Sequence, residues 1–344
     1  MLRRLVVGIL PTGLATLSVV LVGTLLILML GQSPLAVATQ AVNSTLFTGA
    51  GLADLLFRAA PLILTGLAAA IPLSAGLFNI GGEGQLLLGG LGCAFAAEHF
   101  GAPAGLLAAV ICGGAGGALT GWLKHARAVS EVLSTIMLNF VYAALCGYLV
   151  HGPLEDVGTG HTPELPDAML FTRLSTWIPM FEGSLVSTSL LLAVALALGS
   201  QWIMFRTVFG FELRANGASA LAARHAGIAS LRMTMGSMAL GGAMAGLAGA
   251  HFVLGARRFF EDGMSGGQGF LGIAVALMAR GNPWAVVPSA LLFAGLGQAG
   301  LAMGSFVPRE MVLVLQGLVV LVLGASSALL LRIPVARSRG ARGA

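Results

Sequence analysis

The sequence predicts an all-α polytopic membrane protein with about ten transmembrane helices in two inverted five-helix halves. Three observations predict this class. The 344 residues are 57% hydrophobic and 9% charged, at a mean hydropathy of +0.94. Long charge-free stretches recur, and a glycine-rich motif returns about half a chain later. Soluble chains carry about 25% charged residues, so a soluble enzyme, a nucleic-acid-binding protein and a secreted disulfide scaffold are excluded.

Each charge-free stretch that can cross the hydrocarbon core, which takes about 20 residues, is predicted to be one span. The expected spans are 5–30, 52–74, 79–97, 103–123, 132–150, 183–204, 234–255, 266–280, 284–303 and 311–331. The eighth is short, and a broken or re-entrant span is tolerated only where protein or a water cavity covers its backbone. The first span is too long for a typical signal peptide and is expected to be retained. The whole chain, 1–344, is expected to form a single transmembrane domain.

The 18 Lys and Arg residues predict the orientation of the chain. Lys and Arg collect in cytoplasmic connections. With the N-terminus inside, most of them fall at the cytoplasmic ends of the spans and in the inner connection 205–233. Acidic residues gather instead in the outer connection 151–182. Both termini are therefore expected in the cytoplasm, and the net charge of +5 is interpreted as a topology signal.

An internal repeat is suggested by one motif that occurs twice. Gly81-Gly82-Glu83-Gly84-Gln85-Leu86 returns as Gly266-Gly267-Gln268-Gly269-Phe270-Leu271, five predicted spans later. An odd number of spans means that the second copy enters the bilayer from the opposite side, as in the inverted repeats of many transporters. The expected repeat cores are 52–150 and 234–331. Coincidence stays open as the alternative, because 50 residues are glycine.

Glu83 is the one carboxylate predicted to lie deep in the spans and away from a loop. A charge at the bilayer centre costs about 2.5–3.5 kcal/mol on insertion scales, so it needs a partner, a cavity or a proton. Asn79 and Gln85 flank it, and together these side chains could hydrogen-bond the hydroxyl groups of a solute. The alternative is structural: Glu83 offsets the dipole and satisfies free N–H groups in the first turn of its own helix.

Close helix packing is expected at three small-xxx-small pairs, because small residues let helices approach closely in lipid. These pairs are Gly113/Gly117, Gly242/Gly246 and Gly300/Gly304. His251, which falls within a span, is expected to be a hydrogen-bonded packing residue. No catalytic residues, metal site or cofactor are expected.

The inner connection 205–233 contains a predicted short helix between Ser219, a good N-cap, and Gly227, a good C-terminal stop. Its positive charge fits a docking element for a soluble partner, and a membrane-surface loop is the alternative. Lys124 is the only lysine and does not stand in a GxxxxGK[ST] motif. The chain therefore has no phosphate-binding loop, and any ATP would be hydrolysed by another subunit.

Five sequence blocks resemble the membrane-spanning permease subunit of bacterial ATP-binding-cassette importers, in the branch that takes up nucleosides and simple sugars. The blocks are Gly76–Gln85, Glu131–Asn139, His161–Pro166, Gly210–Ile228 and Gly269–Ala276. The resemblance implies a non-catalytic, multi-pass permease of the bacterial inner membrane. Its implied partners are cytoplasmic ATPase subunits, a second homologous permease, an extracytoplasmic solute-binding protein and membrane lipid, with no nucleic acid.

The resemblance also implies roles for individual residues. Phe78, Asn79, Glu83, Gln85 and Gln268 would line the translocation pathway. The segment 205–233 would be the cytoplasmic coupling loop that contacts the ATPase, through Gly210, Glu212, Arg214, Gly217, Ala222, Ala223 and Gly227. Two other functions stay open: a self-sufficient secondary transporter in which Glu83 takes up and releases a proton, and a passive channel.

Overall fold

The computed structural model describes residues 17, 20–25, 27–29, 31–127, 129–302, 314, 317 and 318. Contacts divide the chain into two compact units, one of residues 1–40 with 303–344 and one of residues 41–302. Of the expected span 5–30 the structure describes residues 17, 20–25 and 27–29, and of 311–331 it describes residues 314, 317 and 318. Within these residues the secondary structure is helical, apart from two isolated β-bridges, His161 with Glu261 and Arg173 with Ser187.

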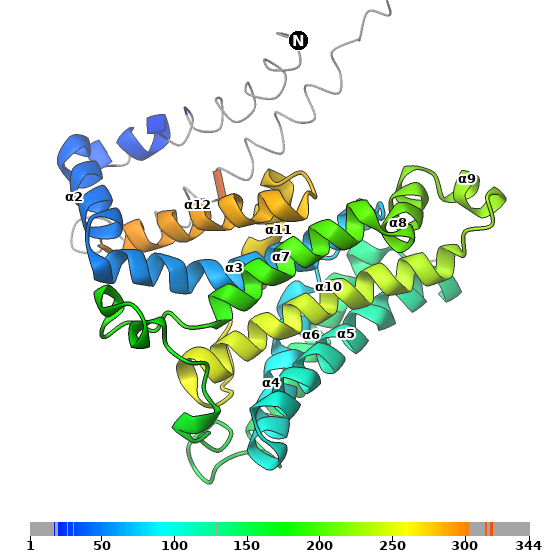
Figure 1. The fold of residues 1–344 in the computed structure, drawn as a ribbon, viewed down its shortest axis with the longest axis horizontal. Coiled ribbons are helices and arrows are strands. Elements are labelled where there is room, and N and C mark those ends of the chain that lie inside the picture. Colours follow the sequence, from blue (N-terminus) through cyan, green and yellow to red (C-terminus); the bar gives the residue numbers. More distant parts are fainter. Residues whose placement is uncertain are drawn as a thin grey trace, which may run out of the picture. The chain divides into compact units, whose positions relative to one another are not determined.

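The helices follow the predicted spans closely from the second to the ninth (Figure 1). They are α2 (Pro34–Leu46), α3 (Gly49–Ser74), α4 (Gly82–Phe100), α5 (Ala102–Arg127), α6 (Glu131–Val150), α7 (Ser189–Arg206), α8 (Val208–Ala218), α9 (Ala220–His225), α10 (Ser230–Phe252), α11 (Gln268–Met278) and α12 (Pro283–Ala302). Short 3₁₀ turns interrupt the connection 151–188, and a π-helical turn, Val253–Arg257, continues α10.

The expected count of about ten spans is not confirmed by the described residues. Six of their helices are long and apolar enough to cross a membrane, or seven if the bent pair Val20–Met29 and Pro34–Leu46 is one span. Two predicted spans fail this test for different reasons. Helix α11 has only 11 residues, and α4 is rich in glycine and carries Glu83 and Glu98. Neither has to be uniformly apolar, because protein covers much of each helix.

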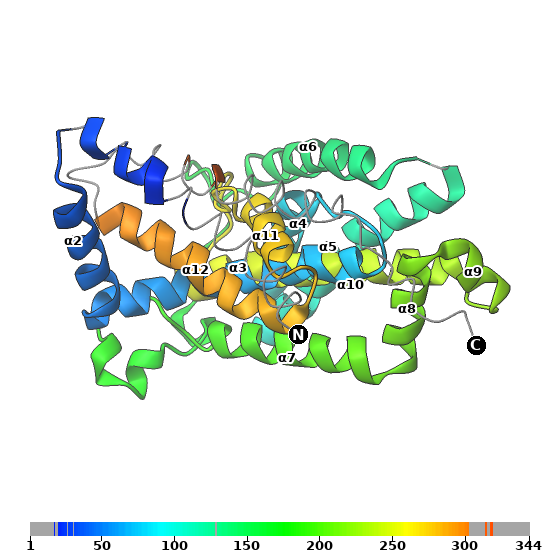
Figure 2. The ribbon, with the colours of Figure 1, turned by 90° about the horizontal axis from the view of Figure 1, so that it is seen from above.

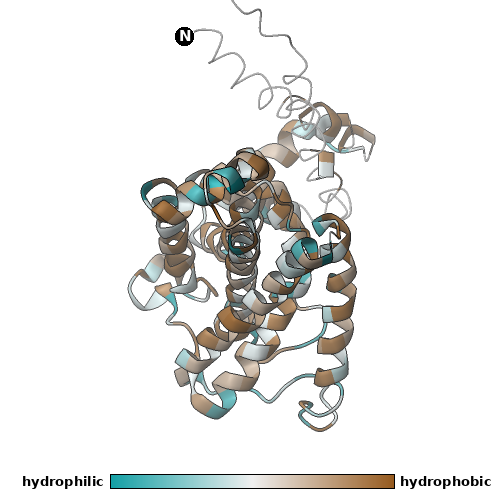
Figure 3. Ribbon diagram, turned by 90° about the vertical axis from the view of Figure 1, so that its right-hand side faces the viewer, coloured by the Kyte–Doolittle hydropathy of each residue, from teal (hydrophilic) through white to brown (hydrophobic). Residues whose placement is uncertain are grey.

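Helices α3 and α10 form the interior of the unit 41–302. The apolar window of α3 is 83% buried and that of α10 is 78% buried, against 28% for α6 and for α7. Helix α3 packs against α7, α10, α11 and α12, and α10 packs against α4 and α5 (Figure 2). The outer helices keep exposed apolar side chains along their lengths, and hydrophilic residues gather at helix ends and connections (Figure 3). This pattern suits a lipid environment.

The unit 41–302 has two opposite faces where its helices end. One, here called the 151–188 face, holds that connection and the start of α3, because Gly49 lies against Met180. The other, here called the α8–α9 face, holds those two helices and the end of α3, where Gly76 lies against Gly217. Helix α11 ends near the α8–α9 face. The chain that follows it reaches Gly281, which lies beside Leu73 near the end of α3.

Helices α5 and α10 cross at the predicted glycine pairs. A Cβ added at Gly113 would lie 2.3 Å from the Gly242 carbonyl oxygen and 2.8 Å from the Gly246 Cα. A Cβ added at Gly117 would lie 2.0 Å from the Met238 carbonyl oxygen. The prediction of close packing is confirmed at these two pairs. Gly304 of the third pair lies outside the described residues.

Candidate functional site

The two copies of the glycine-rich motif meet at the starts of α4 and α11. Helix α4 begins at Gly82 and α11 begins at Gln268. A Cβ added at Gly269 would lie 2.4 Å from both the Cα and the backbone nitrogen of Glu83. Glycine is therefore required at 269, because any side chain there would collide with the α4 backbone. The backbones at the two helix starts are therefore in direct contact.

The carboxylate of Glu83 joins the two helix starts. One oxygen accepts a hydrogen bond from the Gly269 backbone N–H at 2.8 Å, and the other accepts one from the Ser265 hydroxyl. Gly269 is in the first turn of α11, so Glu83 caps that helix. The carboxylate also stands in the first turn of α4 and therefore offsets the positive dipole ends of both helices. The structural alternative placed this capping on α4 alone, and the contact with α11 was not predicted.

Asn79 and Gln85 form a buried amide pair, with relative exposures of 3% and 0%. Asn79 Nδ2 donates to Gln85 Oε1 at 2.9 Å, and Gln85 Nε2 donates to Asn79 Oδ1 at 3.1 Å. Asn79 Nδ2 also donates to the Ala68 carbonyl at 3.1 Å. That carbonyl has no helical N–H partner because Pro72, four residues later in α3, has none. The Asn79 amide therefore replaces the hydrogen bond that Pro72 cannot make, and the pair joins α3 to α4.

Asn139 of α6 caps α4 and is a site residue that was not predicted from the sequence. Its Oδ1 accepts from the Gly84 backbone N–H at 2.9 Å, and its Nδ2 donates to the Ile80 carbonyl at 2.9 Å. A lone asparagine inside a predicted apolar span was the available signal, because a polar side chain in a span needs a hydrogen-bond partner. Helix α4 is thus capped by α6, and α11 is capped by α4.

Phe78 and Gln268 lie at the edges of this cluster. Phe78 is 45% exposed, and with Asn79 it lines a cavity of about 10 Å³ between α3 and α11. A space of that size holds about one water molecule. Gln268 Oε1 is enclosed and accepts no hydrogen bond. The predicted pathway residues are therefore gathered around the helix starts, and the cavity beside Asn79 is too small to hold a solute.

The inner connection forms two helices where one was predicted. The predicted short helix is α9, which begins where the Ala222 N–H donates to the Ser219 hydroxyl at 3.3 Å. It stops at Gly227, whose φ of +83° is favourable only for glycine. Leu221 on this helix is 69% exposed, and Ala222, Arg224 and Gly227 are exposed as well. Ala223 is buried at 4%.

Helix α8 precedes α9 and is held against the transmembrane helices. A Cβ at Gly210 would lie 2.3 Å from the Ile203 carbonyl oxygen, and one at Gly217 would lie 2.5 Å from the Ser74 carbonyl oxygen. The Arg214 guanidinium lies 4.7 Å from the centre of the Phe205 ring. Glu212 and Arg214 are half-buried. The predicted coupling residues therefore separate into packing contacts on α8 and an exposed surface on α9.

The connection 151–188 is ordered by contacts with the segment that follows α10. The Thr162 N–H donates to the Phe260 carbonyl at 3.0 Å, and the Leu165 N–H donates to the Arg258 carbonyl at 2.8 Å. Asp167 forms an ion pair of 2.6 Å with Arg258. A cavity of about 260 Å³ opens between this connection and the end of α4, and it is lined in part by Glu98, His99 and Glu155.

Two further polar groups lie within the spans. Gln298 of α12 accepts from Arg58 Nε at 3.0 Å and donates to Asp54 Oδ2 at 3.2 Å, which links α12 to α3. His251, predicted to be a hydrogen-bonded packing residue, is 1% exposed and has its Nδ1 2.8 Å from the Ser189 hydroxyl. That prediction is confirmed.

Comparison with known proteins identifies a family and several relatives. Residues 51–324 match the family described as "Branched-chain amino acid transport system / permease component". A glucose ABC transporter permease protein of Haloferax volcanii is 34% identical over 90% of this chain and 85% of its own length. A guanosine ABC transporter permease protein of Bacillus subtilis is 34% identical over 78% and 79%. A nucleoside ABC transporter permease protein of Lactococcus lactis is 28% identical over 92% and 91%. No solved structure matches the chain.

Proposed function

The chain belongs to the permease family of branched-chain amino acid transport systems and is the permease subunit of an ATP-binding-cassette importer, and we propose that its solute is a nucleoside or a simple sugar. The proposal is supported by the names of three relatives, which specify glucose, guanosine and nucleosides. These solutes are uncharged at neutral pH and rich in hydroxyl groups. A branched-chain amino acid, the solute in the family description, carries two opposite charges and would need charged partners in the pathway.

The α8–α9 face is proposed to be cytoplasmic, with both termini on the same side of a bacterial inner membrane. Support comes from the charges that end on each face. Arg127, Arg206, Arg224 and Arg232 stand at helix ends on or beside the α8–α9 face. The acidic connection, with Asp167, lies on the other. Positive residues concentrate on the cytoplasmic side of membrane proteins.

Helices α4 and α11 are proposed to be matching elements of two inverted halves, 52–150 and 234–331, and to border the translocation pathway. Support comes from their starts, which meet through Glu83 and Gly269. Transporters with inverted repeats place broken helices with facing ends near the middle of the membrane, where the substrate binds. The cluster would open toward the solute when the two halves move apart during alternating access.

Helix α9 is proposed to fit a groove on a cytoplasmic ATPase subunit. The observation that carries this proposal is its exposure, because a six-residue helix is marginal alone and needs a surface to pack against. A second permease is proposed to complete the transporter, and a solute-binding protein is proposed to dock on the 151–188 face. The chain would supply the translocation pathway and the surface on which the ATPase acts, and ATP hydrolysis by the ATPase would supply the energy.

Reversing the charge of α9 should weaken binding of the ATPase subunit. We expect Arg224→Glu to reduce co-purification of the ATPase at least about fivefold, since a repulsive charge in an interface costs on the order of 1 kcal/mol or more. Arg214→Glu should weaken it less, because the Arg214 guanidinium packs on Phe205. The measurement is the ratio of ATPase to permease after affinity purification in mild detergent.

The matched control for this charge reversal is Arg127→Glu, at the end of α5 on the same side of the unit. It changes the net charge equally but not the α9 surface. Unchanged co-purification with Arg224→Glu, or an equal loss with Arg127→Glu, would contradict the assignment of α9.

The proton-coupled alternative gains no support from the site. Both oxygens of Glu83 already accept hydrogen bonds, from Ser265 and Gly269. The relatives that specify a transport system are ABC transporter permeases. We therefore assign Glu83 a role in joining helices, not in carrying protons.

A further inference from the structure

The end of α8 lies directly on the backbone turn that ends α3. A Cβ added at Gly217 would lie 2.5 Å from the Ser74 carbonyl oxygen and 2.9 Å from the Gly76 backbone nitrogen. Gly76 has a φ of +74° and returns the contact, since a Cβ there would lie 3.0 Å from the Gly217 carbonyl oxygen. This is backbone against backbone, where no flexible side chain can absorb a displacement. A movement of α8 toward this turn must therefore displace the turn.

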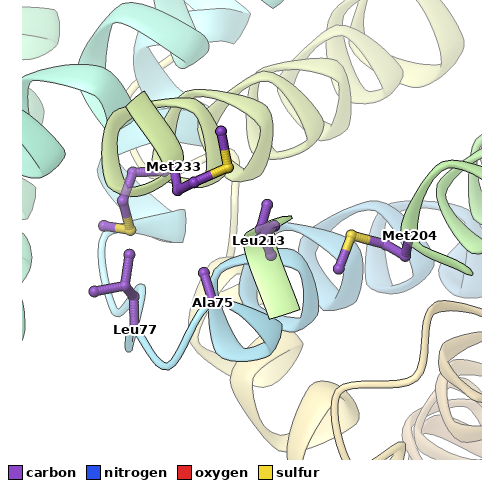
Figure 4. Packing of buried hydrophobic residues seen from close by; sticks show 6 residues of the cluster. Ala75, Leu77, Met204, Leu213 and Met233 are labelled. Carbon is purple, nitrogen blue, oxygen red and sulfur yellow. The ribbon is translucent and has the colours of Figure 1, made fainter. Parts of the chain in front are cut away.

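The same junction is locked by a buried apolar cluster (Figure 4). Leu213 of α8, at 0% exposure, packs in one cluster with Ala75 and Leu77 of the turn. Met204 of α7, and Met233 and Met238 of α10, are the other members of the cluster, and Figure 4 labels the first two of these methionines. Close-packed protein interiors resist compression and transmit strain to their neighbours. The cluster thus joins α8 to residues 75–77 as one packed body.

The turn leads within a few residues to the start of α4. Leu77 is followed by Phe78 and Asn79, and Asn79 is bonded to Gln85 in the first turns of α4. The Gly81 N–H donates to Asn79 Oδ1 at 3.1 Å. A displacement of residues 74–77 therefore acts on a hydrogen-bonded segment that ends at Glu83, the residue that caps α11. Only Phe78 separates Leu77 of the turn from Asn79 of the amide pair.

We propose that Gly217 is a positioning residue that transmits movement of α8 and α9, through the turn 74–77 and the amide pair of Asn79 and Gln85, to the junction of α4 and α11. The inference rests on the proposed role of α9 as the ATPase contact. The close approach of Gly217 to the turn 74–77, here called the joint, connects the ATPase contact to the pathway. Helix α9 receives the partner, and the joint converts its displacement into a change at the helix starts.

The test is the number of solute molecules moved per ATP hydrolysed, measured on the complete transporter in proteoliposomes. The probe is a radiolabelled nucleoside or glucose, whichever the unmodified transporter accumulates. We compare Gly217→Ala, which forces the joint apart, with Leu77→Ala, which loosens it without adding volume. Gly199→Ala in α7 is the matched control, because no atom outside its own helix lies within 4 Å of a Cβ there.

We expect both joint variants to retain the ATPase and to keep hydrolysing ATP. The solute moved per ATP should fall between about 2-fold and 30-fold, the range that residues along a coupling route produce, and Gly199→Ala should match the unmodified chain. If the Gly217→Ala transporter does not assemble, the solute moved per ATP by the Leu77→Ala transporter is the test. An unchanged ratio, including a parallel fall of uptake and hydrolysis, would overturn the inference. Failure of the proposed function would appear separately, as no ATP-dependent uptake by the unmodified transporter.

Discussion

Replacement of Glu83 by alanine is expected to lower uptake more than about tenfold while the amount of protein in the membrane falls much less. The variant removes the acceptor for the Gly269 N–H and the Ser265 hydroxyl. Hydrogen bonds to a charged group contribute about 1.5–3 kcal/mol each, and an unpaired buried donor costs about 1–3 kcal/mol. It also removes the negative charge between two positive helix ends. The start of α11 should then lose its fixed position against α4.

Uptake per molecule of permease is the measurement, with abundance taken from immunoblots of the same membranes. Leu88→Ala is the control, because Leu88 belongs to the same helix, is half-buried and lies beside Gly116 of α5. It should leave uptake near the level of the unmodified chain. Equal losses of uptake and abundance for Glu83→Ala would show that the residue only supports folding.

Replacement of Gly242 by leucine is expected to reduce the folded protein to a small fraction of its normal amount. A Cβ alone would lie 2.1 Å from the Gly113 carbonyl oxygen and 3.0 Å from the Gly117 nitrogen, so α5 and α10 would have to separate. Overpacking a core costs about 1–3 kcal/mol and sometimes more, and here backbone atoms must move. A loss of about 3 kcal/mol is a large part of the usual 5–15 kcal/mol of stability.

Membrane abundance and thermal unfolding in detergent measure this effect. Gly199→Leu in α7 adds the same side chain where no atom outside its own helix lies within 4 Å of a Cβ, and it should behave as the unmodified chain. Normal abundance and an unchanged melting temperature for Gly242→Leu would contradict the close packing of α5 against α10.

The long helices were predictable because lipid imposes a simple local rule on the sequence. A charge-free stretch marks a span, so the predicted 132–150 became Glu131–Val150 and 284–303 became Pro283–Ala302. The rule is weaker for α4, which was predicted as the span 79–97 but is less apolar than the other spans, because it is shielded by protein and keeps Glu83 and several glycines. It also misses α8, whose apolar residues alternate with Arg214, Asn216 and two glycines. Burial by neighbouring helices, not local hydropathy, decides both.

The residues of the candidate site could be predicted from the sequence, but the hydrogen bonds between them could not. The recurrence of the glycine-rich motif singled out Glu83 and Gln268, and the structure brings their helix starts together. The bonding partners of Glu83, however, lie more than half the chain away. Asn139 caps α4 from another helix. Such partners depend on tertiary packing, which a local pattern does not encode. By contrast, the need for a donor such as Asn79 near Pro72 can be inferred from the sequence, because proline has no backbone N–H for the carbonyl four residues earlier.

ATP-driven accumulation of a radiolabelled nucleoside or simple sugar in reconstituted vesicles is the most direct test of the central claim that this permease is powered by other subunits. The complete transporter, with its second permease, ATPase subunits and loaded binding protein, should concentrate the solute only when ATP can be hydrolysed. Vesicles that contain this chain alone should not concentrate it, with or without an imposed proton gradient. Concentrative uptake by the single chain, abolished by an uncoupler, would contradict the claim.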